Sequence, residues 1–166
     1  GHVQPPTASR HLALLVENGL LVVEQRGRHR YHRLAGPAVA KAVEDIMQLA
    51  AVARPAAPRR VVTGPRDAEM RRARSCYDHI AGRLGVAITG QLLAGGGIEL
   101  DEDSGTVTPQ LAHALGPLGE ATSRADAALH SCRPCLDWSE RRPHLAGKLG
   151  RWICAQCLER GWLTRK

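Results

Sequence analysis

The sequence is poor in aromatic residues. It contains no phenylalanine, and its three tryptophans and two tyrosines make up 3% of the 166 residues. The hydrophobic core must therefore be built from leucine, isoleucine, valine and alanine. The sequence also lacks an apolar run of about 18 residues, so we expect no transmembrane helix and no membrane partner. Because its first residues do not show the pattern of a secretory signal, we expect a cytoplasmic protein.

Motifs of the common catalytic classes are missing as well. The glycines at 95–97 follow an expected helix instead of preceding one, so they do not form a phosphate-binding loop. The chain has neither a serine nucleophile motif nor HExxH. A thiol enzyme built on Cys76 and His79 would lack a third catalytic residue and an oxyanion hole. The sequence therefore predicts a binding protein and not an enzyme.

Excess positive charge is confined to the first half of the chain. Residues 1–74 contain 13 Lys and Arg against 6 Asp and Glu, whereas residues 75–166 contain 10 of each. The net charge of +7 thus belongs to the first half, which favours a polyanionic partner for that half. A soluble basic surface that binds no partner would carry the same charge. Charge alone therefore does not establish a polyanionic partner.

Residues 7–34 supply such a pattern, because they predict a short helix followed by a two-stranded hairpin. Apolar residues recur at helical spacing over 8–15, and Asn18-Gly19 is typical of a helix end. An apolar, β-prone run follows over 20–24. The turn and the return strand are then crowded with arginines, namely Arg26, Arg28, Arg30 and Arg33. A helix sized for the major groove, followed by arginines that reach phosphates, predicts DNA binding.

Three motifs in this region resemble the winged-helix DNA-binding domain of the ArsR family of bacterial transcriptional repressors. They are SRHL at 9–12, ENGL at 17–20 and GRHRYHRL at 27–34, and the resemblance extends over residues 3–52. Pro5-Pro6 departs from the family pattern, although proline is tolerated in a first helical turn. His32 stands where an aromatic residue is usual in the family.

The resemblance implies a sequence-specific transcriptional regulator, a repressor that binds double-stranded operator DNA as a homodimer and responds to an unidentified effector. The recognition helix would contact DNA through its exposed polar side chains and the wing through its basic ones. These DNA-binding residues are Thr7, Ser9, Arg10, His11, Arg26, Arg28, His29, Arg30 and Arg33.

A second helix is expected from Pro37 to about Val52, with an apolar stripe along it. In the resembling family the corresponding helix packs between two subunits, and the alternative is a helix packed within its own domain. We thus expect a partial winged-helix domain with a dimerisation helix at 1–53, a linker rich in proline and arginine at 54–66, and an extension at 67–166. We also expect helices before residue 1, because residues 1–4 cannot supply the helix that precedes a recognition helix.

The extension contains an internal repeat, over 76–120 and 132–166. The two copies share nine of 22 residues between 79–100 and 144–165, and each is preceded by Cys-x-Asp. Each copy is expected to form an amphipathic helix followed by a strand, with a further helix over 109–120. The expected fold is mainly α with small β-hairpins (α+β), a winged helix-turn-helix followed by a duplicated helical, degenerate winged-helix extension.

The cysteines suggest a metal site. Cys132, Cys135, Cys154 and Cys157 have the spacing C-x2-C-x18-C-x2-C, which suits a tetrahedral four-thiolate zinc site. Apart from zinc at this site we expect no cofactor, and the alternative function is a zinc-stabilised protein-interaction module that uses the paired CxxC motifs. The repeat favours another interpretation, since Cys154 and Cys157 lie at positions i and i+3 of an amphipathic helix, where small buried residues are expected.

A second constellation follows from the repeat. If the copies pack about a twofold axis, Cys76, Asp78 and His79 of one copy approach their counterparts Cys135, Asp137 and His144 in the other. Thiolates, imidazoles and carboxylates together suit Zn²⁺ or a similar transition metal, and Cys76 beside His79 suits a redox-sensitive thiol. The simpler interpretation is that the two aspartates are helix N-caps and the histidines lie on the first helical turn.

Overall fold

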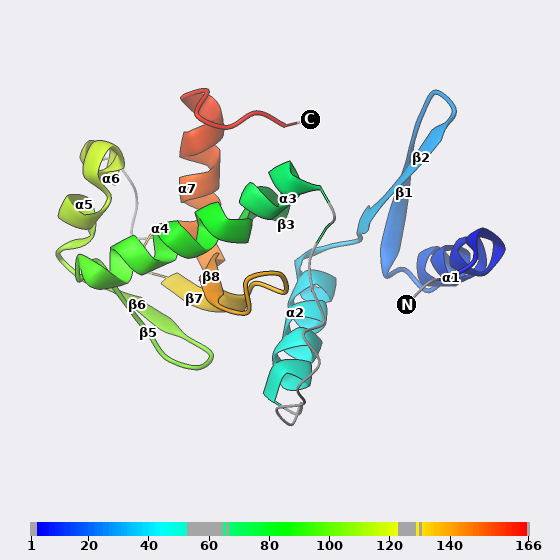
Figure 1. Cartoon of the computed structure of the whole chain (residues 1–166), viewed down its shortest axis with the longest axis horizontal. Helices are drawn as coiled ribbons and strands as arrows, with labels where there is room; N and C mark the ends of the chain where they lie inside the picture. The colour runs from blue at the N-terminus through cyan, green and yellow to red at the C-terminus, as the bar shows by residue number, and fades with distance from the viewer. Residues whose placement is uncertain (1–2, 53–64, 66, 123–128, 130, 166) are drawn as a thin grey trace. The chain divides into compact units, whose positions relative to one another are not determined.

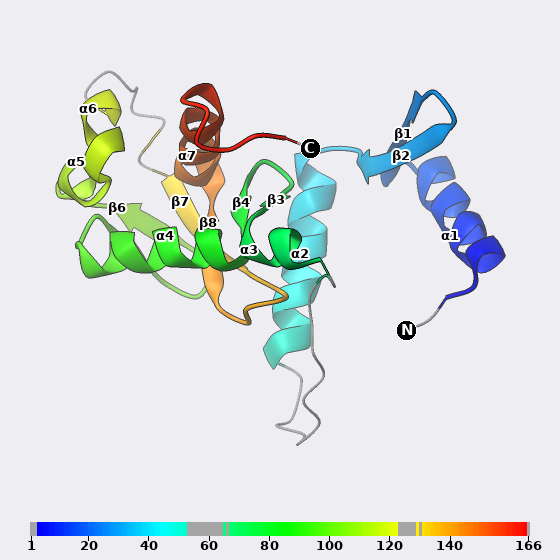
Figure 2. The same cartoon turned by 45° about the horizontal axis from the view of Figure 1, so that its top comes forward.

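The computed structural model describes residues 3–52, 65, 67–122, 129 and 131–165. The chain divides into two compact units, residues 1–50 and 51–166 (Figures 1 and 2). The expected linker at 54–66 lies outside the described residues, apart from Pro65. None of the described helices is both long and apolar enough to cross a bilayer.

The first unit consists of a helix, a hairpin and a second helix. Its elements are α1 (Pro5–Glu17), β1 (Leu21–Arg26), β2 (His29–Leu34) and α2 (Pro37–Val52). Proline occupies the first turn of α1, and the helix ends at Asn18 and Gly19, whose φ of +71° is the left-handed conformation that glycine adopts readily. The strands pair in antiparallel register from Leu21 opposite Leu34 to Arg26 opposite His29. The helices and the hairpin expected from the sequence are therefore confirmed.

The second unit mixes short strands with helices. Its elements are α3 (Ala68–Arg72), β3 (Arg74–Cys76), β4 (His79–Ala81), α4 (Gly82–Ala94), β5 (Ile98–Leu100), β6 (Gly105–Val107), α5 (Leu111–Ala114), the 3-10 helix η1 (Gly116–Leu118), α6 (Gly119–Thr122), β7 (Ser131–Leu136), β8 (Pro143–Ala146) and α7 (Gly147–Glu159). Within the described ranges, β3 pairs with β4, and β5, β6, β7 and β8 form one antiparallel sheet in that order. The fold is therefore α+β, as expected.

The two repeat copies have the same local structure, a hairpin followed by a helix. Copy one is β3-β4-α4 and copy two is β7-β8-α7. The hairpin turns contain Tyr77 and Arg141, both with φ of 56°, and the helices begin at Gly82 and Gly147, with φ of 78° and 80°. Each helix packs against the hairpin of the other copy, α4 on β8 and α7 on β4, an arrangement visible for α4 in both views (Figures 1 and 2). This exchange brings the two hairpins together.

The core of the second unit is aliphatic, as the composition predicted. Its buried side chains include Ile80, Leu92, Ile98, Leu145 and Leu149. Because β6 pairs with β7, the hairpin after copy one and the hairpin of copy two share a sheet. The copies therefore form one unit with a common core, and not two separate winged-helix units.

The helix expected over 109–120 is not continuous. The chain forms three short pieces there, α5, η1 and α6. Gly116 has a φ of +54° and Pro117 cannot donate a backbone hydrogen bond, so the helix is interrupted between residues 114 and 119.

Candidate functional site

Helix α1 exposes the side chains expected to contact DNA. Thr7, Ser9, Arg10 and His11 are all exposed, and α1 has no buried residue. The half-buried positions Ala8, Leu12 and Val16 recur at a spacing of four, which gives the helix an inner side. The polar side chains at 7–11 are therefore accessible to a partner.

The hairpin presents the basic wing. Arg26, Arg28, His29, Arg30 and Arg33 are all exposed. Arg26 is partly engaged, since its guanidinium lies 2.8 Å from Glu24 and 5.9 Å from the centre of the Tyr31 ring. No described residue forms an ion pair with Arg28, Arg30 or Arg33. Their charges are therefore available for phosphate groups.

Helix α2 carries an exposed apolar stripe. Val43, Ile46 and Leu49 follow one another at intervals of three residues, and their exposed fractions are 40%, 66% and 68%. Large aliphatic side chains in a row are unfavourable in water, because each leaves apolar surface unburied.

Two cysteines and two histidines come together in the second unit. Cys76, His79, Cys135 and His144, called the Cys/His cluster below, place one sulfur or nitrogen atom each within 4.8 Å of all the others. The histidines and Cys135 are buried, with exposed fractions of 1%, 1% and 3%, and Cys76 is half-buried. Cys76 lies opposite His79 in the β3–β4 pair, and Cys135 lies opposite His144 in the β7–β8 pair.

A carboxylate stands beside each histidine of the cluster. Nδ1 of His79 lies 3.1 Å from Oδ1 of Asp78, in hydrogen-bond geometry. Nδ1 of His144 lies 3.2 Å from Oδ2 of Asp137, within ion-pair distance but outside hydrogen-bond geometry. The other ring nitrogens face each other, because the two Nε2 atoms are 3.0 Å apart.

An arginine of the opposite copy binds each of these carboxylates. Arg74 of copy one contacts Asp137 at 2.7 Å, with side-chain exposures of 7% and 0%. Arg151 of copy two contacts Asp78 at 2.6 Å. Asp137 also accepts a hydrogen bond from the backbone N–H of Gly82 at 2.6 Å. The two ion pairs therefore link the copies in both directions around the Cys/His cluster.

The electrostatics of the cluster favour charged side chains. The pKa of Cys76 is lowered to about 3, because hydrogen bonds to Cys135 and the two histidines stabilise its thiolate more than burial disfavours it. Burial also disfavours the carboxylate of Asp137, yet the adjacent His144 ring and the hydrogen bonds from Ser139, Gly82 and Arg74 hold its pKa well below its usual range. Burial acts to lower the pKa of His144, but Asp137 and Cys76 raise it above its ordinary value.

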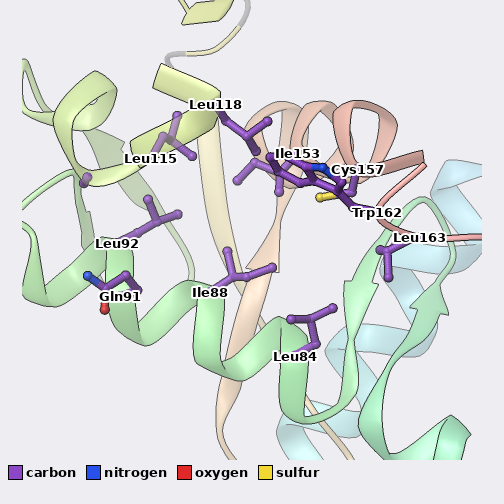
Figure 3. A pocket seen from close by; sticks show the side chains of 11 residues that line it. Leu84, Ile88, Gln91, Leu92, Leu115, Leu118, Ile153, Cys157, Trp162 and Leu163 are labelled. Atoms are coloured by element: carbon purple, nitrogen blue, oxygen red, sulfur yellow. The ribbon is translucent and has the colours of Figure 1, made fainter. Parts of the chain in front are cut away.

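An apolar cavity lies elsewhere in the second unit. It has a volume of about 350 Å³ and lies between α4, α7 and the segment containing α5 and η1 (Figure 3). Its lining is almost entirely apolar and includes Leu84, Ile88, Leu118 and Trp162, with Gln91 at one side. The cavity is distinct from the Cys/His cluster, none of whose residues line it.

One relative places the chain among known proteins. It is 35% identical over 171 residues to the uncharacterized HTH-type transcriptional regulator YdfF of Bacillus subtilis (strain 168). The alignment covers 99% of this chain and 72% of that protein. The chain belongs to the HTH-type transcriptional regulators. The predictions of a DNA-binding transcriptional regulator, and of a protein that is not an enzyme, are thus confirmed. No family model matches the sequence, and no solved structure matches it.

In this regulator the four cysteines of the paired CxxC motifs do not form a common ligand group. Cys135 belongs to the Cys/His cluster, whereas Cys132, Cys154 and Cys157 are part of the hydrophobic core. Burial raises the pKa of each of these three thiols, which favours the uncharged form. The structure of the described residues therefore does not support the four-cysteine zinc site. It places the cysteines and histidines of the repeat-related constellation, Cys76, His79, Cys135 and His144, together instead.

The expectation that the two aspartates cap their own helices is wrong. Helices α4 and α7 have alanines at the N-cap, Ala81 and Ala146, without a side-chain hydrogen bond. The histidines lie on strands β4 and β8 and not on a first helical turn. Because Asp137 accepts from Gly82, it stabilises the start of the helix of the other copy.

Sequence reasoning missed the two arginines of the cluster. Arg74 could have been found, because Arg-x-Cys-x-Asp occurs both at 74–78 and at 133–137. No shared motif marks Arg151, because the equivalent position of the other repeat copy is Val86.

Proposed function

We propose that this chain is an ArsR-type repressor that binds operator DNA as a homodimer. The observation that carries the proposal is the order of an exposed polar helix, α1, and an exposed basic hairpin in one unit. Helix α1 has the diameter that fits a major groove, and the hairpin is narrow enough to follow the phosphate backbone beside it.

The two elements have different tasks in this proposal. Ser9, Arg10 and His11 on α1 read base edges, where an arginine pairs well with guanine. Arg28, Arg30 and Arg33 bind phosphates, which gives affinity without sequence preference. Arg30 and Arg33 lie on opposite faces of β2, because their spacing is odd, and Arg28 lies in the turn. The wing can therefore meet phosphates on more than one side.

A second copy of the chain covers the exposed stripe of α2 in this proposal. Val43, Ile46 and Leu49 are apolar, exposed and spaced along one helix, as a helix–helix interface requires. Dimerisation would set two α1 helices at a fixed separation, which must match adjacent turns of the major groove. An effector that changes this separation would release the operator.

The wing assignment is tested by the variant Arg28→Ala/Arg30→Ala. Each lost phosphate contact reduces the slope of log K against log salt concentration by about 0.9, so the slope should fall by about 1.8 per protomer. The measurement is fluorescence anisotropy of a labelled duplex at several salt concentrations. The control Arg83→Ala/Arg142→Ala removes two exposed arginines from the second unit and should leave the slope unchanged. An unaltered affinity and slope in the wing variant would overturn the assignment.

A further inference from the structure

We propose that the second unit binds one Zn²⁺ ion between its two repeat copies, through Cys76, His79, Cys135 and His144. Two thiolate sulfurs and two imidazole nitrogens are a ligand set that zinc prefers, and four protein ligands make a closed site of structural type. The proposal does not depend on DNA binding, since it concerns the second unit alone.

The distances fit a tetrahedron. Zinc–sulfur bonds of about 2.3 Å and zinc–nitrogen bonds of about 2.0 Å place the ligand atoms of a tetrahedral site about 3.3 to 3.8 Å apart. The four ligand atoms of the cluster all lie within 4.8 Å of one another, and the two Nε2 atoms are 3.0 Å apart. The separations therefore need to change by at most about 1.5 Å to complete the coordination.

The histidine rings are oriented as metal ligands are. Asp78 and Asp137 face the Nδ1 atoms of His79 and His144, which favours a proton on each Nδ1. In this tautomer each Nε2 keeps its lone pair for a metal ion, and the two Nε2 atoms lie 3.0 Å apart in a buried place. Both imidazoles could therefore bind the same cation through Nε2.

Charge balance points to a divalent cation. The carboxylates of Asp137 and Asp78 are neutralised by Arg74 and Arg151, respectively. Cysteine binds a metal as its thiolate, so a cation bound by Cys76 and Cys135 would meet a combined charge of −2 in a place where unpaired charge is costly. A divalent ion makes the whole cluster neutral.

The ion would hold the two copies together. Each copy contributes one cysteine and one histidine from paired strands, Cys76 with His79 and Cys135 with His144. The β3–β4 hairpin is short, with three residues per strand, and such a hairpin has little stability of its own. Zinc bound by both hairpins therefore stabilises the second unit in the folded state.

The first test is the metal content of the full chain, purified under reducing conditions. We expect about one zinc per chain by mass spectrometry of the acidified protein. After zinc removal, Co²⁺ should restore the site and give the intense visible bands of tetrahedral coordination with thiolate charge-transfer bands beside them. A folded wild-type chain that retains no zinc, or that binds Co²⁺ in octahedral form, would overturn the proposal.

Variants distinguish this site from a four-cysteine site. Cys76→Ser and His144→Ala should reduce the zinc content at least about tenfold, because each removes a ligand. Cys154→Ala is the matched control, since Cys154 is buried in the core and its loss should leave zinc bound. Zinc retained in Cys76→Ser, or lost in Cys154→Ala while circular dichroism shows a folded chain, would contradict the proposed ligands. The wild-type Co²⁺ spectrum decides the case even where a variant fails to fold.

Discussion

At the scale of single residues, Asp137 connects the two halves of the second unit. Its side chain is fully buried and accepts hydrogen bonds from Arg74, from Ser139 and from the backbone of Gly82. A buried carboxylate is stable only when its oxygens are satisfied in this way. Arg74 depends on it in turn, since that guanidinium has an exposed fraction of only 7%.

Asp137→Asn should therefore destabilise the second unit by about 3 to 5 kcal/mol, because the substitution leaves the charge of Arg74 buried without a counter-charge. Urea unfolding followed by tryptophan fluorescence is a suitable measurement, since all three tryptophans, 138, 152 and 162, lie in the second unit. The exposed Asp103 provides the control Asp103→Asn, which should change the free energy of unfolding little. A loss below about 1 kcal/mol in Asp137→Asn would mean that the pair contributes no more than a surface ion pair.

Two glycines at equivalent positions of the repeat allow the close approach of helices and hairpins. A side chain at Gly85 would overlap the carbonyl oxygen of Ile80 and come within 3.3 Å of His144 Cβ. A side chain at Gly150 would overlap the carbonyl oxygen of Leu145 and come within 3.4 Å of His79 Cβ. Alanine at either position must displace a hairpin that carries a histidine of the cluster.

Gly85→Ala and Gly150→Ala should each lower the stability of the second unit by about 1 to 3 kcal/mol. Gly90→Ala is a matched control in α4, because a Cβ there meets nothing within 4 Å. The control should be neutral or stabilising by up to about 1 kcal/mol, since alanine favours helix. Equal effects of Gly85→Ala and Gly90→Ala on thermal unfolding would show that the close approach does not constrain the fold.

At the scale of elements, the sequence predicted those that local signals define. The spacing of apolar residues, the Asn18-Gly19 end and the arginine-rich turn predicted α1 and the β1–β2 hairpin, and Gly36-Pro37 predicted the start of α2. Strands β3 and β4 were missed, because they have three residues each and their pairing is favoured only by packing against the other copy. The interruption of the helix expected over 109–120 has a sequence signal, Gly116-Pro117, which the prediction did not take into account.

The difference between local signals and long-range packing also explains the outcome of the metal predictions. Spacing along the chain suggested the paired CxxC motifs, but Cys154 and Cys157 lie one helical turn apart on α7 and both face the core. The Cys/His cluster depends on two strand registers and on the exchange of helices between copies, which no spacing along the chain encodes. The repeat was the one sequence signal that placed Cys76 beside Cys135.

Helix α1 leads to a prediction about sequence choice. Arg10→Ala should weaken binding to the preferred duplex by about 1 to 3 kcal/mol and leave binding to unrelated duplexes nearly unchanged, if Arg10 reads a base. Anisotropy with a preferred and a scrambled duplex measures the ratio. Arg28→Ala is the comparison, since a phosphate contact should weaken both duplexes alike. A similar loss on both duplexes in Arg10→Ala would assign Arg10 to the backbone.

At the scale of the whole molecule, the two units differ in character. The first unit exposes its basic wing and the apolar stripe of α2, whereas the second unit encloses the cluster, the Arg74–Asp137 ion pair and a hydrophobic core. The surfaces proposed to bind DNA and a second copy of the chain therefore both lie in the first unit.

Dimerisation through α2 is testable in solution. Ile46→Glu places a charge in the middle of the stripe, so it should shift the chain from dimer to monomer and weaken operator binding at least about tenfold. Light scattering after size-exclusion chromatography gives the mass of each form. Lys41→Gln, a change at an exposed polar position of α2, should leave the dimer intact. A dimer that persists in Ile46→Glu would place the interface elsewhere.

Selection of bound duplexes from a random DNA pool tests the central claim most directly. A dimer with two α1 helices in adjacent major grooves should enrich an inverted repeat, with half-site centres about 10 base pairs or a multiple of this apart. Arg10→Ala should relax the preference within each half-site, and the spacing should persist. A pool that shows no preferred sequence with the wild-type protein, at salt concentrations where it binds DNA, would contradict the account.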